Sequence, residues 1–281
     1  MVATPRVLKP DEERLSTFYL RLRADALLVR SIGMLQSLSA LGGAGAAVTL
    51  PGSTSGGTVR VPALYGDFSL NAANTLTAAH FLTAGLARLT PAHDLNAQQL
   101  AALARSVGPS AANQLEVVVH QHLPVFHTEH CVFARQLSEG RSFRDCGHPC
   151  ETHALHLRDP QGQDHRVLAD AGCRNTVFNA AAQSGAADVA TLAAACVGGL
   201  RVELLDDPPH EVAPLLEAYR RLAEGRDAPK AVLAWLETRG DANGAKQGVT
   251  HGSLETRPER ARADMKQTAA AGRNAAAGKG R

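Results

Sequence analysis

The feature that most constrains the fold of this chain is the alternation of short apolar runs with helical stretches. Segments 26–30 and 115–120 are short and rich in Ala, Leu and Val, which is typical of strands buried on both faces. Between such runs, segments 31–41 and 95–107 have the pattern of helices, and Asp94 is placed to cap the second one. Strands that alternate with helices in this way predict a parallel sheet with right-handed crossovers.

The number of strands decides between an open sheet and a closed barrel. Strands are predicted at 2–8, 26–30, 59–64, 87–90, 115–120 and 200–205. A closed barrel of this type needs eight. The sequence therefore predicts an α/β fold, either an open sheet or a TIM-barrel-like (β/α) domain that lacks its first strands.

Two segments depart from this pattern. Residues 42–58 are rich in Gly, Ser and Thr and predict a flexible surface insertion. From Gly240 onward no apolar face is sustained, and residues 241–281 contain 8 Lys and Arg but 4 Asp and Glu. We therefore predict a β/α domain over 1–239, with a cysteine-rich segment at 120–175, and a disordered basic tail over 240–281. The domain itself is slightly acidic, so its overall charge gives no argument for nucleic-acid binding.

The hydropathy of the chain and its first residues indicate where in the cell the protein is expected. No stretch approaches the ~20 apolar residues of a membrane helix, and the first residues lack the charged start and apolar core of a secretory signal. We expect a cytoplasmic protein without membrane contact, or one inside an organelle if the chain is a fragment of a longer precursor. Its 5 cysteines should then be reduced, and they need an explanation other than disulfides.

Four of the 5 cysteines fall in one segment with most of the histidines. Gaps of fourteen, three and twenty-two residues separate Cys131, Cys146, Cys150 and Cys173. Four thiolates suit tetrahedral zinc or a cubane of iron and sulfide. One short pair with two single cysteines favours a cluster, because structural zinc usually takes two short pairs. Buried inert thiols and a reactive thiol are the alternatives, and the remaining cysteine, Cys196, is expected to be a buried free thiol in an apolar helix.

The local sequence indicates how these thiols could converge. Gly147 frees the backbone and Pro149 restrains it, so the loop can turn Cys146 and Cys150 inward. Segments 154–157 and 165–168 flank the turn sequence at 159–162 and predict a β-hairpin that leads to Cys173.

Polar residues near this segment and at strand ends are the other candidates. His127, Glu129 and His130 could act as acid or base, or hydrogen-bond the cysteine loops. Two further groups could bind substrate or have a structural role, as a polar rim or as helix caps: His120 and His122 at one strand end, and Asp67 and Asn71 after another. No Gly-x-Ser-x-Gly elbow, His-Glu-x-x-His helix or P-loop is present, and a Cys–His protease would leave the other cysteines unexplained.

At these residues the sequence resembles a known family, the collagenase-like peptidases of unclassified peptidase family thirty-two. The matching stretches are residues 65–77, the segment around Cys131, 145–150 and 170–175. Segments 200–206 and 212–219 look like the last strand and helix of the family. The resemblance covers roughly residues 1–225, and the cysteine pattern is its most specific part.

The resemblance implies a TIM-barrel-like domain with a [4Fe–4S] cluster on Cys131, Cys146, Cys150 and Cys173, with zinc as the alternative metal. Relatives imply oxygen-independent or prephenate-linked hydroxylation of ribosomal RNA, of transfer RNA uridine or of a ubiquinone precursor. By this analogy RNA is the expected partner and prephenate a candidate hydroxyl donor. Candidate substrate-binding residues are Asp67, Asn71, His120, His122, Arg174 and Asn175.

Two other functions stay open at this point. One is a collagenase-like peptidase, the older label of the family, although no nucleophile can be transferred. The other is a non-catalytic remnant that binds RNA or a partner protein. The first strand of this chain resembles the third strand of the family, so the family's first strands are missing here. This suggests a fragment, a split gene product or a shortened paralogue. A protein partner could then complete the barrel.

Overall fold

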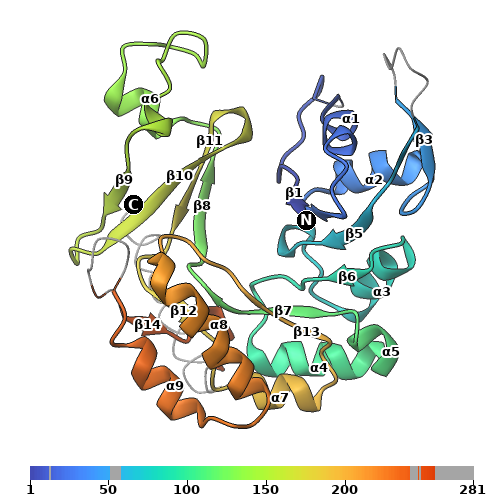
Figure 1. The fold of residues 1–281 in the computed structure, drawn as a ribbon, viewed down its shortest axis with the longest axis vertical. Helices are drawn as coiled ribbons and strands as arrows, with labels where there is room; N and C mark the ends of the chain where they lie inside the picture. The colour runs from blue at the N-terminus through green and yellow to red at the C-terminus, as the bar shows by residue number, and fades with distance from the viewer. Residues whose placement is uncertain (13, 51–57, 241–245, 247, 257–281) are drawn as a thin grey trace, which may run out of the picture.

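The computed structural model describes residues 1–12, 14–50, 58–240, 246 and 248–256. Its N-terminal half is a parallel four-stranded sheet in the order β1-β2-β5-β6, with helices in the connections (Figure 1). The elements are β1 (Val2–Ala3), α1 (Arg14–Arg21), β2 (Ala26–Val29), α2 (Ile32–Ala40), β5 (Ala63–Gly66), the 3-10 turn η1 (Phe68–Leu70), α3 (Thr75–Thr83), β6 (Arg88–Leu89), α4 (Ala97–Val107) and α5 (Pro109–Ala112). The predicted β/α alternation is confirmed here.

A second four-stranded sheet, in the order β13-β7-β12-β14, continues from the first. A single parallel bridge between Leu89 and Leu115 joins the two sheets. Strand β7 pairs in parallel with β13 and antiparallel with β12. The new elements are β7 (Glu116–Gln121), β12 (Ala182–Ser184), α7 (Val189–Ala194), β13 (Gly199–Val202), α8 (Pro209–Ala223), α9 (Pro229–Leu236), β14 (Val249–Thr250) and the 3-10 turn η4 (Gly252–Leu254).

The cysteine-rich segment forms a separate antiparallel sheet in the order β8-β11-β10-β9. Figure 1 shows this sheet and α6 on the side opposite β1 and α1, with β7 and β13 below both. The predicted hairpin is confirmed as β9 and β10, and the structure adds two strands to it. Its elements are β8 (Pro124–Thr128), α6 (Val132–Leu137), the 3-10 turn η2 (Pro149–Glu151), β9 (Leu155–Arg158), β10 (Asp164–Asp170), the 3-10 turn η3 (Ala171–Cys173) and β11 (Arg174–Phe178).

The fold is therefore mixed α/β, as expected, but the described strands do not close into a barrel. After the bridge at Leu89 the sheet continues through β7, and the strands there run in both directions. The antiparallel β12 pairs with the side of β7 opposite β13, and no described strand joins β13 to β1.

Helix starts follow the capping chemistry of the sequence. Ser31 caps α2 and Asn74 caps α3, each accepting a hydrogen bond from a backbone N–H three residues on. The expected cap of α4, Asp94, is wrong. Asn96 caps this helix instead, in a reciprocal capping box with Gln99, because the pair satisfies two backbone donors at once.

Two apolar cores hold the β/α region together. The first contains Leu27, Val29 and Leu64 of the parallel sheet and the inner faces of α2 to α4. The second contains Val117 and Val119 of β7 with residues of α7, α8 and α9. Partly buried Leu95 and Val197 pack against both, so the two cores are continuous.

Several segments differ from the sequence prediction. The strand predicted over 2–8 is limited to β1, and residues 4–8 are not part of a strand. The predicted insertion at 42–58 contains β3 (Ala47–Thr49), paired with β4 (Thr58–Arg60), and Val48 of this hairpin is buried in the first core; residues 51–57 lie outside the described residues. The strand predicted over 59–64 is divided between β4 and β5, with Pro62 between them.

The predicted disordered tail begins too early. Beyond Gly240, β14 pairs with β12 and Leu254 is buried in the second core. Residues 257–281 of that segment lie outside the described part of the chain.

Among the helices that the structure describes, none combines the length and apolar character of a membrane span.

Gly198, directly before β13, packs closely against the backbone of Asn113. A Cβ at this position would overlap the backbone carbonyl of Asn113. Because backbone atoms cannot rotate away, we expect Gly198→Ala to lower the free energy of unfolding by about 1–3 kcal/mol in urea titrations. Gly33→Ala in α2 is the control, since its Cβ would meet Leu8 at an ordinary 3.8 Å. Equal stability of the two variants would contradict this packing.

Candidate functional site

Cys131 lies at the junction between β8 and α6. It is the N-cap residue of α6, and its Sγ accepts a hydrogen bond from Ala134 N at 3.4 Å. The amide of Asn175 on β11 accepts from Val132 N at 2.6 Å. The sheet thus fixes the first turn of the helix, and with it the position of the thiol.

The loop that carries Cys146 and Cys150 is shaped by its own polar residues. The Asp145 carboxylate accepts from Ser142 N at 2.7 Å and from the Ser142 hydroxyl at 2.9 Å. Gly147 and His148 both have positive φ, 69° and 52°, and Pro149 then begins η2. These two left-handed residues reverse the chain between the two cysteines, which agrees with the role predicted for the Gly and Pro.

Cys173 lies in the tight connection between β10 and β11. Gly172 and Cys173 have φ values of 73° and 61°. A left-handed conformation is uncommon for a side chain without an amide or carboxyl group. The pairing of Asp170 with Arg174 across the hairpin holds the strained turn in place, and strain of this kind is concentrated at functional sites.

These loops bring the four predicted cysteines together. Burial raises the pKa of the Cys173 thiol, and repulsion from Cys131, Cys146 and Cys150 raises it further. The pKa of Cys150 is raised by burial and by Cys131 as well. All are free thiols. Within the described ranges, no three His, Cys, Asp or Glu side chains are close enough to chelate a single metal ion.

The fifth cysteine was mispredicted. Cys196 is exposed, with φ 61°, because α7 ends before it and the chain turns there toward β13. The thiol is therefore not part of the apolar face of α7.

Arg174 is the central charged residue beside the thiols. Its side chain is 2% exposed, and its guanidinium contacts Glu129 at 2.8 Å and Glu12 at 3.3 Å. Lys9 forms a further ion pair with Glu129. These contacts connect the turn at Cys173 with the end of β8 and with the chain before α1. The substrate role predicted for Arg174 and Asn175 stays a prediction, while their visible contacts position the cysteines.

The three predicted acid–base residues have different surroundings. His127 Nδ1 hydrogen-bonds the Thr176 hydroxyl at 2.9 Å, and its Nε2 is buried without a partner. Burial lowers the pKa of His127. Hydrogen bonds from Lys9 and then Arg174 lower the pKa of the exposed Glu129 carboxyl. His130 is exposed. Their catalytic role stays a prediction.

A charged cluster occupies the carboxyl ends of the parallel strands. The carboxylate of Asp67, which follows β5, is 3% exposed and contacts Arg201 Nη2 at 2.7 Å and Arg30 Nε at 3.3 Å. Arg30 follows β2, and Arg201 lies on β13. We call Arg6, Arg30, Asp67, His93 and Arg201 the strand-end cluster. In β/α proteins, sites are built at this end of the strands.

Asp67 and Asn71 have different surroundings in the structure. The Asp67 side chain makes no cap hydrogen bond to η1 and turns instead to the arginines. Asn71 is exposed, and with φ 58° it ends η1 in the left-handed conformation. Substrate binding by either residue is still a prediction.

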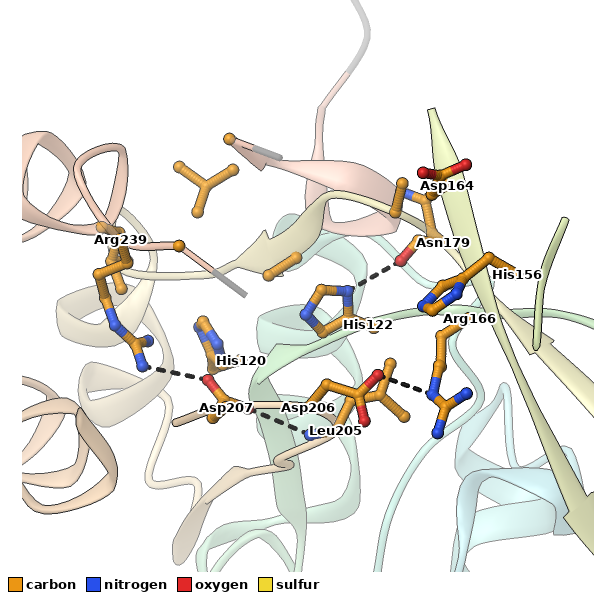
Figure 2. A pocket seen from close by; sticks show the side chains of 16 residues that line it. His120, His122, His156, Asp164, Arg166, Asn179, Leu205, Asp206, Asp207 and Arg239 are labelled. Carbon is orange, nitrogen blue, oxygen red and sulfur yellow. Dashed lines mark hydrogen bonds and ion pairs between the residues drawn. The ribbon is translucent and has the colours of Figure 1, made fainter. Parts of the chain in front are cut away.

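His120 and His122 line one pocket of about 60 Å³, shown in Figure 2. Ion pairs of Arg166 with Asp206 at 2.7 Å and of Arg239 with Asp207 at 3.1 Å border it. We call this the His120 pocket. The predicted shared face of the two histidines is confirmed, and the pocket lies between β7, the β9–β10 hairpin and the end of α9.

Hydrogen bonds fix the two imidazoles of the His120 pocket. His122 Nδ1 donates to the Asn179 carbonyl at 2.8 Å, so the neutral ring has its lone pair on Nε2. His120 Nδ1 lies 3.2 Å from the Tyr219 hydroxyl, which also bonds Ser184 at 2.7 Å. Burial lowers the pKa of His120 to about 4, so this ring is neutral near pH 7.

Sequence reasoning missed Arg6, Arg30, Arg201 and His93. A signal was present, because Arg30 directly follows the apolar run of β2 and Arg201 interrupts that of β13. A charged residue at the end of a buried strand needs a partner nearby. The sequence did not show that this partner is one shared carboxylate.

The family model of Peptidase family U32 matches residues 63–243 of the chain. The chain belongs to this family. The match extends from β5 through α9 and includes all four converging cysteines. Searches of curated proteins and of solved structures gave no match.

The low pKa of His120 makes a prediction for stability against pH. The unfolded chain takes up a proton near pH 6.5, but the folded ring does so only near 4. Stability should therefore fall as pH drops through this window, by up to about 1.4 kcal/mol per pH unit from this residue. His120→Gln should remove that part of the slope in urea titrations between pH 7 and 4. The exposed His80→Gln should retain it, and parallel slopes for wild type and His120→Gln would contradict the assignment.

Proposed function

We propose that this chain is an iron–sulfur protein that takes part in the hydroxylation of an RNA base. The observation that supports it most is the convergence of Cys131, Cys146, Cys150 and Cys173 from three separate segments of the chain. A TIM-barrel-like domain lacking its first strands is the finer fold assignment that goes with this proposal.

The donor set fits a [4Fe–4S] cluster. Cys131, Cys146 and Cys150 lie close enough to Cys173 to raise the pKa of its thiol, and such a group of thiols suits a cationic iron–sulfide core, because the metal offsets the repulsion between thiolates. Thiolates around a cubane also lie further apart than around one zinc ion, since irons and sulfides lie between them. Zinc, with Zn–S bonds of about 2.3 Å, would need the four sulfurs drawn together.

The residues around the thiols have separate proposed tasks. Arg174, held by Glu12 and Glu129, keeps the Cys173 turn against the end of β8. His127 is the candidate for moving a proton, because its ring is held by Thr176 while its Nε2 has no partner. When bound, the cluster would supply one-electron transfer.

RNA as the substrate rests on membership of the family and on the resemblance of the cysteine segment to its hydroxylation proteins. Prephenate is the proposed hydroxyl donor on the same grounds. The predicted residues His120, His122, Asp67 and Asn71 remain the candidates for contacting substrate.

Metal content is the first test. Protein purified and reconstituted without oxygen should contain about four irons and four sulfides per chain. Cys146→Ser should lose most of both. Cys196→Ser is the matched control, because this thiol is exposed and outside the converging set, and it should retain them. Zinc in place of iron, or iron that survives Cys146→Ser, would rule out the proposed cluster.

RNA chemistry is tested separately. Ribosomal and transfer RNA from cells of the source organism with this gene deleted should lack one added oxygen, about 16 Da, on a single nucleotide. Complementation with wild type should restore the mass, and Cys146→Ser should not. Identical RNA masses in all strains, together with gelatin cleavage by the purified protein, would favour a peptidase instead.

A further inference from the structure

One buried polar group beside the converging cysteines is left without a partner. The side chain of Asn175, on β11, is 0% exposed. Its Nδ2 atom has no hydrogen-bond partner among the described residues. Buried amide groups are nearly always paired in folded proteins, so an unpaired NH2 group at this place needs a cause such as a bound group that accepts from it.

The orientation of the Asn175 amide is fixed by a backbone donor. Its Oδ1 accepts a hydrogen bond from Val132 N at 2.6 Å. A backbone N–H can only donate, so the oxygen faces it and the NH2 group occupies the other arm of the amide. Turning the amide over would place two donors against each other. The unpaired group is therefore a hydrogen-bond donor.

Asn175 lies on the face of the antiparallel sheet against which the thiol-bearing segments pack. Val177, two residues further along β11, points to the same face as Asn175. It packs there with Phe133 of α6 and with Cys131. The turn η2, which contains Cys150, also contacts α6. The NH2 group is thus held on the same side of β11 as Cys131, α6 and η2.

The free thiol of Cys131 does not take up this donor. Its Sγ accepts from Ala134 N at 3.4 Å, on the first turn of α6. A neutral thiol is a weak acceptor. A thiolate bound to iron, or a sulfide, carries negative charge, and hydrogen bonds to charged acceptors are about twice as strong as those between neutral groups. The donor is therefore in place before an acceptor of matching charge.

We propose that the Asn175 side-chain NH2 group donates a hydrogen bond to a sulfur atom of the iron–sulfur cluster, Cys131 Sγ or an adjacent sulfide, and raises the reduction potential of the cluster. Reduction adds one negative charge, which strengthens the hydrogen bond. The donor therefore stabilises the reduced form more than the oxidised form. This inference rests on the proposed iron–sulfur centre and assigns one residue that sets its potential.

A redox titration tests the inference. Asn175→Leu has a side chain of about the same size but no N–H donor. Reconstituted without oxygen, this variant should hold as much iron and sulfide as wild type. Its equilibrium constant for reduction should fall about tenfold, which is about 59 mV for a one-electron couple.

Asn74→Leu is the matched control for this titration. It removes the amide that caps α3, outside the cysteine segment, and should titrate like wild type. A fully loaded Asn175→Leu protein with the wild-type potential would overturn the inference. An equal shift in Asn74→Leu would overturn it as well.

A measurement on the wild-type protein covers the case in which Asn175→Leu does not fold or hold iron. Asparagine labelled with ¹⁵N only in its side-chain amide is incorporated, and the reduced, paramagnetic protein is examined by pulsed electron paramagnetic resonance. A hydrogen bond from this amide to a cluster sulfur should give a ¹⁵N coupling. Absence of the coupling would overturn the inference.

Failure of this inference and failure of the proposed function give different results. Wild-type protein without iron and sulfide would overturn the proposed function and this inference with it. Iron and sulfide in full amount, with neither a shift in potential nor a ¹⁵N coupling, would overturn only the role of Asn175.

Discussion

The ion pairs of Asp67 are the interaction on which the arrangement of the strands depends. This buried carboxylate, at the end of β5, contacts Arg30 after β2 and Arg201 on β13. It therefore connects the N-terminal sheet with the second sheet, whose only backbone link among the described residues is one bridge at Leu89. Removing one partner of a buried pair leaves an uncompensated charge, which typically costs about 3–5 kcal/mol. Arg30 also contacts Asp170, and Arg201 also contacts Glu203, so the two arginines share several carboxylates at this end of the strands.

Arg174 holds the cysteine segment in place through ion pairs, as Asp67 holds the strand ends. Its guanidinium reaches Glu129 at the end of β8 and Glu12 before α1. The antiparallel sheet is thereby joined to the start of the chain. Because Cys173 directly precedes Arg174, the ion pairs also fix the strained turn on which that thiol is carried. The cysteine segment and the strand-end cluster are neighbours, since Arg30 of the cluster contacts Asp170, which precedes the Cys173 turn, at 3.8 Å.

Much of the fold followed from local signals. The apolar runs of β2 and β7 and the β9–β10 hairpin were predictable, because each depends on residues close together in the chain. The errors have a common origin. Val48 looked like part of a flexible insertion and Leu254 like part of a disordered tail, yet both are buried against cores made by distant residues. Asp94 was a plausible cap, but Asn96 with Gln99 satisfies more donors.

The sequence by itself determined the α/β class, the cysteine pattern and the loop conformations around Cys146 and Cys150, since spacing, glycine and proline act within a few residues. Only the tertiary structure decided that the described strands form two joined sheets without closing a barrel, and which charged groups meet. Charge pairing acts through space, and Asp67 and Arg201, which are 134 positions apart in the sequence, show no local pattern that would indicate their contact. For the same reason, only the fold shows which buried polar atoms, such as His127 Nε2, have no hydrogen-bond partner among the described residues.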